Sequence, residues 1–218
     1  TFANTMKTIL YNKFDKKEIA NLPRAFFPGK IIVILNEAEA DKAVDYLLAQ
    51  DILGIDTETR PVFKKGHHHK VALLQVCDRK VCFLFRLNII GIPPSVIRLL
   101  EDTTIPKIGL SLTDDMLMLH HRAKFEPGNF IDLQNIVEQF GIEDKSLQKL
   151  YANIFGERIV KREQLSNWEN QILTDKQKIY GATDAWTCIR IYERLQELKS
   201  IGNYELVKID ETDNEQEK

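Results

Sequence analysis

Residues 51–60 read Asp-Ile-Leu-Gly-Ile-Asp-Thr-Glu-Thr-Arg, and this stretch decides how the rest of the chain is interpreted. Its first half is apolar, which is typical of a strand buried in a sheet. Asp56 and Glu58 follow at positions i and i+2, and such side chains point to the same face of a strand. Because burying unpaired carboxylates is costly, a cation is expected beside them. The stretch alone leaves two interpretations open: a strand end with two solvated acids, or a cation-binding pair.

Further apolar runs place this strand in a larger sheet. Residues 30–35, 70–77 and 80–85 are expected to be strands, and the last two are so close that they predict a hairpin. Short strands near 107–110 and 129–133 alternate with helices, and Thr174 is expected to cap a long helix that runs to Lys199. The order predicts an α/β fold, a mixed sheet of about five strands with helices on both faces.

Length and composition favour one domain with additions at both ends. Of the 218 residues, we assign 1–29 to an N-terminal extension, 30–200 to the domain and 201–218 to an acidic, disordered tail. The last nine residues carry five carboxylates and one lysine, so the remaining body has a formal charge of +2. A mildly basic body is compatible with a nucleic-acid partner.

Composition also limits the cellular compartments in which the protein is expected. No apolar run approaches the ~20 residues of a membrane span, so a membrane partner is not expected. The three cysteines, Cys77, Cys82 and Cys188, lack metal-ligand spacing and are expected to be buried, reduced thiols. We therefore expect a cytoplasmic protein, or a nuclear one in a eukaryote.

Two other regions carry acids where an enzyme built on a sheet would use them. Asp114 and Asp115 open the helix after the strand that ends at Gly109, although acids at a helix start are often simple caps. Tyr180 and Asp184 lie four residues apart, hence on one face of the long helix. A phenol and a carboxylate on a largely apolar helix need polar partners, either in the core or in a site.

These residues, in this order, resemble the DEDDy-type 3′–5′ exonuclease family, which includes ribonuclease D, polymerase proofreading domains and the Werner syndrome exonuclease domain. The three motifs stand here as Asp56-Thr57-Glu58, as Gly109 followed by Asp115, and as Tyr180-Gly-Ala-Thr-Asp184. The family's spacing selects Asp115 over Asp114, and Ile179 stands where a sister subgroup has histidine. Flanking segments resemble Werner-type members: Gly66 with 70–75, 132–133, 165–168 and 173–177.

The resemblance implies a ribonuclease H-like fold and two divalent ions, Mg²⁺ or Mn²⁺. It implies that Asp56, Glu58 and Asp184 hold one ion, that Asp56 bridges to a second, and that Asp115 supports the second. Tyr180 would orient the attacking water, because a phenol with a reference pKa of ~10 is a poor general base.

Substrate contacts are expected from Thr57, Thr59, Lys70 and Trp168. Trp168 has two open interpretations: stacking on a base, or anchoring its loop to the core. The basic loop that contains Lys64, Lys65 and His67 to His69 could contact phosphates, hold a metal or simply be solvated.

The resulting expectation is an enzyme that hydrolyses phosphodiester bonds from single-stranded or recessed 3′ ends, with DNA favoured over RNA. Three alternatives remain at this point. They are an RNA-trimming enzyme like ribonuclease D, a non-catalytic nucleic-acid-binding module on the same fold, and a protein-interaction adaptor.

Overall fold

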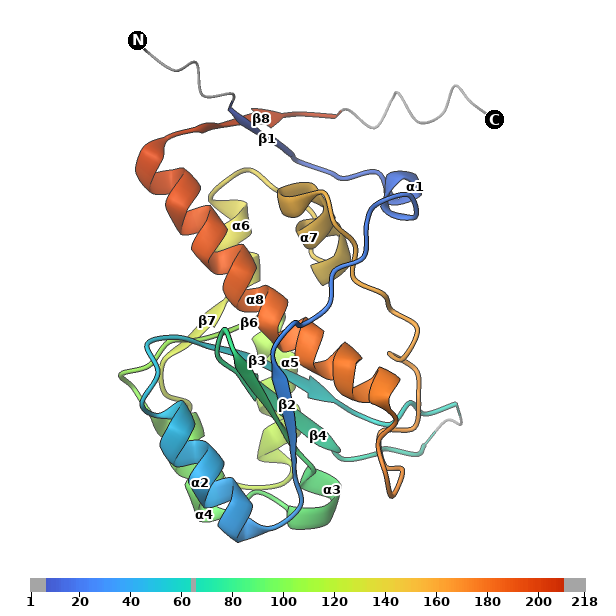
Figure 1. The fold of residues 1–218 in the computed structure, drawn as a ribbon, viewed down its shortest axis with the longest axis vertical. Coiled ribbons are helices and arrows are strands. Elements are labelled where there is room, and N and C mark those ends of the chain that lie inside the picture. The colour runs from blue at the N-terminus through green and yellow to red at the C-terminus, as the bar shows by residue number, and fades with distance from the viewer. Residues whose placement is uncertain (1–6, 64–65, 210–218) are drawn as a thin grey trace.

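A six-stranded mixed sheet forms the centre of the computed structural model, which describes residues 7–63 and 66–209. The strand order is β2-β5-β4-β3-β6-β7 (Figure 1). The central strands β3, β4 and β5 are antiparallel, whereas β2 pairs parallel with β5, and β6 and β7 extend the other side in parallel. Their bounds are β2 (Lys30–Ile34), β3 (Leu53–Glu58), β4 (Leu73–Cys77), β5 (Val81–Phe85), β6 (Lys107–Gly109) and β7 (Phe130–Asp132). The predicted mixed sheet and hairpin are confirmed.

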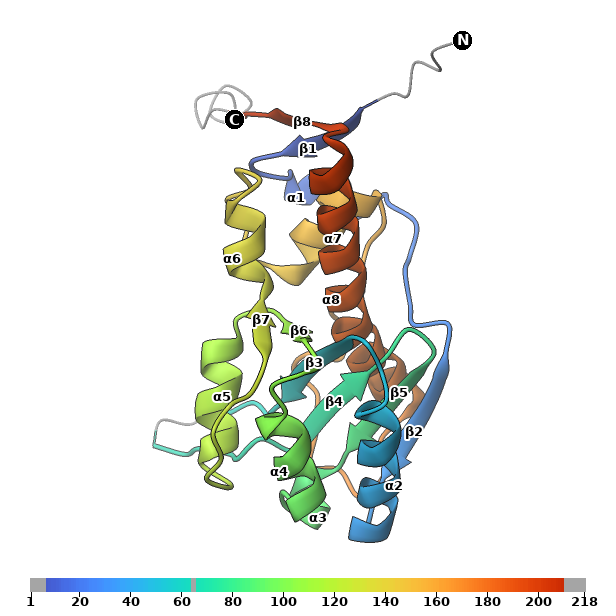
Figure 2. The same ribbon diagram turned by 90° about the vertical axis from the view of Figure 1, so that its left-hand side faces the viewer.

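Helices cover both faces of the sheet (Figure 2). One core contains residues of α6 (Leu133–Glu138), α7 (Leu147–Phe155) and the long α8 (Asp175–Ile201). The other contains residues of α2 (Glu37–Leu47), α4 (Pro94–Glu101), α5 (Leu112–His120) and the one-turn α3 (Leu87–Ile90). Within residues 7–63 and 66–209 no helix has the length and apolar character of a membrane span.

Strand β3 contributes to both faces because its side chains alternate. Leu53 and Ile55 are fully buried in the core of α2, α4 and α5. Gly54 lies on the opposite face, directly under α8, and a Cβ at this position would stand 2.1 Å from the carbonyl oxygen of Ala185. The alternation therefore turns Asp56 and Glu58, which follow Gly54 in steps of two, toward α8.

Helix α8 lies close against the sheet, which brings its polar residues within reach of β3. Its start is fixed by a capping box between Thr174 and Gln177, as predicted from the threonine. Gly54 and Gly181 leave room for the helix: a Cβ on Gly181 would meet the side chain of Gln75 on β4 at 3.2 Å. A larger residue at Gly54 would meet the backbone of α8 and displace the helix from the strand.

A second, two-stranded sheet joins the two ends of the described chain. Strand β1 (Thr8–Tyr11) pairs parallel with β8 (Tyr204–Val207), and α1 (Lys16–Ile19) follows β1. Asn153 on α7 fastens β1, because its side chain accepts from the Tyr11 amide at 2.9 Å and donates to the Tyr11 carbonyl at 2.7 Å.

This small sheet corrects the prediction of a disordered tail. The tail was expected from residue 201, yet α8 continues through Ile201 and residues 204–207 form a strand. The acidic residues from Asp210 onward lie outside the described residues. A four-residue strand whose partner lies almost two hundred positions away leaves no local pattern in the sequence, which is why the prediction missed it.

Candidate active site

Three carboxylates from two elements meet where β3 ends under α8. Asp56 and Glu58 come from the strand and Asp184 comes from the helix, and one oxygen of each lies within 4.8 Å of the others. Glu58 and Asp184 are buried, and Asp56 is partly buried. The structure therefore excludes the interpretation of the strand end as two solvated acids.

Asp115 reaches the same region from the opposite face of the sheet. It lies in the first turn of α5, and its carboxylate accepts a hydrogen bond from the hydroxyl of Thr57. Asp114 is exposed to solvent, whereas Asp115 is partly buried. The choice of Asp115 over its neighbour therefore agrees with the geometry.

Asp132 positions the start of α5, a role that the sequence did not indicate. Its carboxylate accepts from the amides of Ser111 and Leu112 at 3.1 and 2.8 Å, and Ser111 adopts a left-handed conformation with φ 59°. Carboxylates on the first amides of a helix are stabilising. The contact spans about twenty residues, so no short motif could have revealed it.

Burial raises the pKa of all four acids, and neighbouring charges within the cluster add to this for Asp56 and Glu58. Burial, with the nearby charges of Asp115 and Asp184, raises the pKa of Asp56 well above its ordinary value. Burial followed by the charge of Asp56 raises the pKa of Glu58 to about 10. Burial also raises the pKa of Asp115 to about 6 and that of Asp184 to about 7. When such carboxylates are ionised without cations between them, they repel one another, which is electrostatically unfavourable.

Lys161 is the basic residue whose charge acts on the pKa of Asp184. It lines a cavity of about 230 Å³ together with Asp56, Tyr180 and Asp184, and its charge lowers the pKa of Asp184 against the larger effect of burial. Lys161 is exposed and cannot neutralise four carboxylates. Divalent cations are the partners that such a group of carboxylates could hold.

A test of that fit comes from the hydrogen bonds of the acids. In the described part of the chain, the buried Oδ1 atom of Asp184 has no hydrogen-bond partner. A buried carboxylate oxygen without a donor is costly, and a cation satisfies it. All the candidate metal-ligand atoms are carboxylate oxygens, which suit hard ions such as Mg²⁺ and Mn²⁺.

Tyr180 lies one helical turn before Asp184 and lines the same cavity. Burial, then the charges of Asp184 and Glu58, raises the pKa of its phenol well above 10. The hydroxyl therefore stays protonated at neutral pH. It can donate a hydrogen bond but cannot accept a proton as a general base.

Trp168 packs against Tyr180 in the core. The prediction that Trp168 binds substrate is therefore corrected. Its side chain is 0% exposed, and its ring centroid lies 5.9 Å from that of Tyr180. A fully buried indole cannot stack on a base. The structure therefore agrees with the other interpretation, in which Trp168 anchors its loop to the core, where Gln177 also holds the loop through Ser166 at 2.9 Å.

The other residues predicted to contact substrate are absent from the lining of the acid cavity. Thr57 faces Asp115, Thr59 is partly buried, and Lys70 is exposed; none of the three lines the cavity of the acids. In the basic loop, His69 and Arg60 both pair with Glu169 at 3.2 Å, which ties this loop to the segment before α8. Lys64 and Lys65 lie outside the described residues.

Comparisons with known proteins agree with this geometry. A family described as 3′-5′ exonuclease matches residues 31–199. The chain is 31% identical over 194 residues to a 3′-5′ exonuclease of Arabidopsis thaliana, covering 82% of this chain and 67% of the relative. It is 30% identical over 188 residues to the mouse bifunctional 3′-5′ exonuclease/ATP-dependent helicase WRN, covering 82% of this chain but only 13% of that protein.

The fold is also that of a solved nuclease. Escherichia coli RNase D superposes with a TM-score of 0.69 at 20% identity, over 80% of this chain and 46% of that one. At this identity the likeness concerns the fold, which is ribonuclease H-like as expected.

Proposed function

Because this chain belongs to the 3′–5′ exonuclease family, we propose that it hydrolyses phosphodiester bonds from the 3′ end of nucleic acid and releases nucleoside monophosphates. The observation that carries the proposal is the cluster of Asp56, Glu58 and Asp184, whose ligand oxygens lie within 4.8 Å of one another. All five residues expected to perform the chemistry are present, and each lies at or beside this cluster.

The acids are proposed to hold two divalent ions, Mg²⁺ or Mn²⁺. Asp56, Glu58 and Asp184 would hold one ion, and Asp56 and Asp115 would hold the other. When bound, such ions activate a water molecule and neutralise charge on the phosphate and on the leaving oxygen. The chain's part is to fix the carboxylates before the substrate arrives, through β3, α8 and the Thr57–Asp115 hydrogen bond.

Tyr180 is proposed to orient the attacking water by donating a hydrogen bond from its phenolic hydroxyl. Its raised pKa keeps that proton in place, and Trp168 and the body of α8 hold the ring. Correct orientation of a nucleophile accounts for a substantial part of a catalysed rate. Lys161, at the rim of the cavity, is proposed to meet a phosphate of the incoming strand.

DNA is the favoured substrate, since the flanking segments resemble Werner-type members. RNA is the alternative, because RNase D, which shares the fold, is described as an exoribonuclease of structured RNA processing. The choice between DNA and RNA depends on whether the protein contacts the 2′-hydroxyl of the bound strand.

One digestion series tests the activity and the substrate together. End-labelled single-stranded DNA, duplex DNA with a recessed 3′ end, and RNA are incubated with Mn²⁺ or Mg²⁺ alongside an Asp56→Ala variant. We expect metal-dependent release of mononucleotides from the 3′ end, fastest on DNA, and none from the variant. Activity that survives Asp56→Ala would overturn the assignment, and binding without cleavage would favour the non-catalytic module.

A further inference from the structure

A second cavity adjoins the cavity of the acids and is walled by the N-terminal extension. It measures about 410 Å³, and its lining includes Arg24 and Phe26 from the extension, Arg162, and Lys176 and Tyr180 from α8. Tyr180 and Ile159 line both cavities, so the two are adjacent. Arg24 and Phe26 precede residue 31, where the match to the exonuclease family begins.

The extension is held rigidly at this place. The Ala25 amide donates to the Arg158 carbonyl at 2.9 Å, and the Arg158 amide donates to the Pro23 carbonyl at 2.8 Å. Two residues later the Phe27 amide donates to the Thr183 hydroxyl at 3.0 Å, one turn beyond Tyr180. Figure 1 shows the segment descending beside α7 and crossing α8 before it enters β2. The wall of the second cavity is therefore a built part of the fold.

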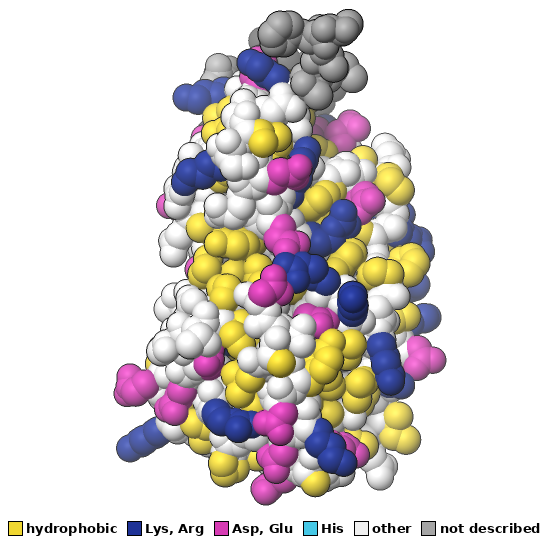
Figure 3. All heavy atoms as spheres, turned by 60° about the vertical axis from the view of Figure 1, so that its left-hand side comes forward, with side chains coloured by type: hydrophobic (Ala, Val, Ile, Leu, Met, Phe, Trp, Pro, Cys, Tyr) yellow, Lys and Arg dark blue, Asp and Glu magenta, His cyan; other side chains and the backbone are white. Residues whose placement is uncertain are grey.

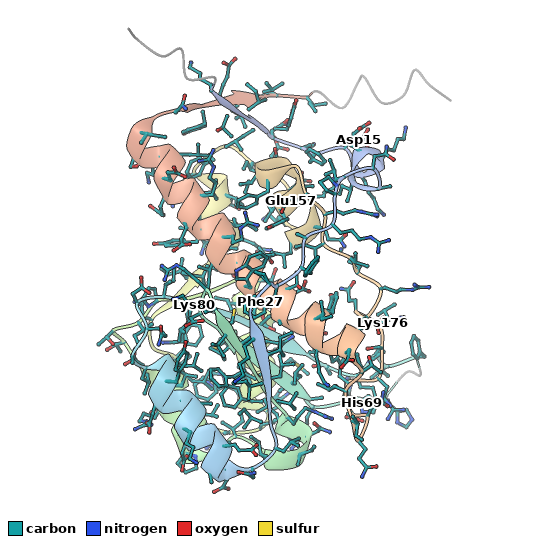
Figure 4. The ribbon with its side chains drawn as sticks, viewed as in Figure 1. Asp15, Phe27, His69, Lys80, Glu157 and Lys176 are labelled. Carbon is teal, nitrogen blue, oxygen red and sulfur yellow. The ribbon has the colours of Figure 1, made fainter. Side chains whose placement is uncertain are left out.

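The neighbouring phenylalanines explain why an aromatic side chain faces solvent here. Phe27, which Figure 4 shows beside α8, is 4% exposed. It packs edge-on against Trp186 of α8, with ring centroids 5.8 Å apart. Successive side chains of an extended segment point in opposite directions. The anchored Phe27 thus turns Phe26 outward, where it is 62% exposed and lines the cavity.

The charges of the cavity match a polyanion. Arg24, Arg162 and Lys176 line it against one carboxylate, that of Glu163. Among the described residues, no carboxylate forms an ion pair with any of the three cations. By contrast, the face in Figure 3 intersperses Lys and Arg with Asp and Glu. Unpaired cations around an exposed aromatic ring are the combination that binds single-stranded nucleic acid, by phosphate contact and base stacking.

We propose that this cavity binds the nucleotides on the 5′ side of the scissile phosphate, with a base stacked on Phe26 and phosphates near Arg24, Arg162 and Lys176. The proposal rests on the proposed exonuclease function. An enzyme that removes the last nucleotide leaves only that one on the 3′ side of the bond. The rest of the strand lies on the 5′ side and must leave the acids through an adjoining surface.

The test compares two substrates in one protein. An Arg24→Ala/Phe26→Ala double variant is assayed on a single-stranded oligonucleotide and on the p-nitrophenyl ester of thymidine 5′-monophosphate, which carries no 5′-side nucleotide. We expect kcat/KM for the oligonucleotide to fall about tenfold or more, mainly through KM, since the variant loses a stacked base and a phosphate contact. Hydrolysis of the ester should change less than twofold. A Lys42→Ala/Ile89→Ala variant, altered at exposed positions of α2 and α3, is the matched control.

The outcomes separate the two proposals. A wild-type protein that cleaves neither substrate would overturn the exonuclease function itself. A wild-type protein that cleaves both, with a double variant that retains full activity on the oligonucleotide, would overturn only the role of the cavity. An equal loss on both substrates, with an unchanged melting temperature, would also contradict it, because that would place the two residues in the catalytic cavity.

Discussion

The hydroxyl of Thr57 donates a hydrogen bond to the carboxylate of Asp115, and this bond joins the two faces of the sheet at the active site. Thr57 lies between Asp56 and Glu58 and therefore points away from them, toward α5. The same strand thus presents two acids to α8 and uses the residue between them to hold a third acid on α5. The candidate metal site is assembled where both cores end.

We predict that Thr57→Val weakens activity without weakening the fold. Valine keeps the branched shape that suits a strand but cannot donate to Asp115. We expect kcat to fall about 10-fold to 100-fold, the range seen when a partner of a metal ligand is removed, and the melting temperature to stay within about 2 °C. The measurement is steady-state nucleotide release with Mn²⁺.

Thr113→Val is the control, because Thr113 is an exposed residue of α5, the helix that carries Asp115. If both variants kept wild-type activity, the Thr57–Asp115 bond would have no part in catalysis.

Asp56→Asn is expected to abolish activity and yet to stabilise the metal-free protein. The raised pKa of Asp56 means that its charge opposes folding at neutral pH, and the amide removes that charge. A gain of about 1 kcal/mol corresponds to roughly 2–4 °C in melting temperature for a chain of this size. Differential scanning fluorimetry in EDTA measures it.

Asp41→Asn should leave both properties unchanged, since Asp41 is an exposed residue of α2 outside the acid cluster. A metal-free Asp56→Asn protein that melted below wild type would contradict the electrostatic argument.

The stability of the metal-free protein should fall as pH rises from about 5 to 8. Burial raises the pKa of Asp115 to about 6, that of Asp184 to about 7 and that of Glu58 to about 10, whereas the pKa of Asp and Glu in the unfolded chain is about 4. Over this window the folded state binds more protons than the unfolded state, so the free energy of unfolding decreases with pH.

Metal should reverse this trend, because divalent ions bind the ionised carboxylates. At 100 times the dissociation constant the ion adds about 2.7 kcal/mol, or roughly 5–10 °C at the scale of a chain this size. The shift on adding Mn²⁺ should therefore be larger at pH 8 than at pH 5. The measurement is a set of melting curves with and without Mn²⁺ across this pH range. If millimolar Mn²⁺ did not shift the melting temperature, the acid cluster would not be a metal site.

Trp168→Phe should lower kcat more than it raises KM. The indole is fully buried against Tyr180, and a smaller ring leaves space into which the phenol can move. Complete truncation in Trp168→Ala should cost about 3–5 kcal/mol of folding stability, which is why the phenylalanine variant is the informative one.

Phe140→Leu is the matched control, because Phe140 is also buried but its ring contacts Tyr204 of β8 rather than Tyr180. Steady-state kinetics and urea denaturation of both variants decide the point. A Trp168→Phe protein that loses affinity for substrate at unchanged kcat would point instead to a direct contact with the strand.

Lys161→Met should weaken binding of the strand in a salt-dependent way. The substitution keeps an apolar stem but removes the charge at the rim of the acid cavity. Losing one phosphate contact should lower the slope of log affinity against log salt by about 0.7 for a single strand. Anisotropy titrations of a labelled oligonucleotide in Ca²⁺ give this slope.

Lys80→Met is the control, because Lys80 lies in the turn between β4 and β5, far from Lys176 and the start of α8 (Figure 4). An unchanged slope for Lys161→Met would remove Lys161 from the phosphate contacts.

The sequence by itself determined the central sheet, the long helix and the five residues of the candidate site. These features are local: apolar runs, the capping Thr174, and acids at spacings of two and four residues, each of which follows from the geometry of one strand or one helix. The family resemblance then joined the three motifs, and the structure brought the same residues together.

Only the tertiary structure decided which side chains face the substrate and which support the site. The pattern around Trp168 allowed both stacking and burial, and packing against Tyr180 settled it in favour of burial. Asp132, the β1–β8 ribbon and the cavity walled by Arg24 and Phe26 all depend on contacts between distant parts of the chain. Such contacts form only when the whole fold closes, so no local pattern of residues records them.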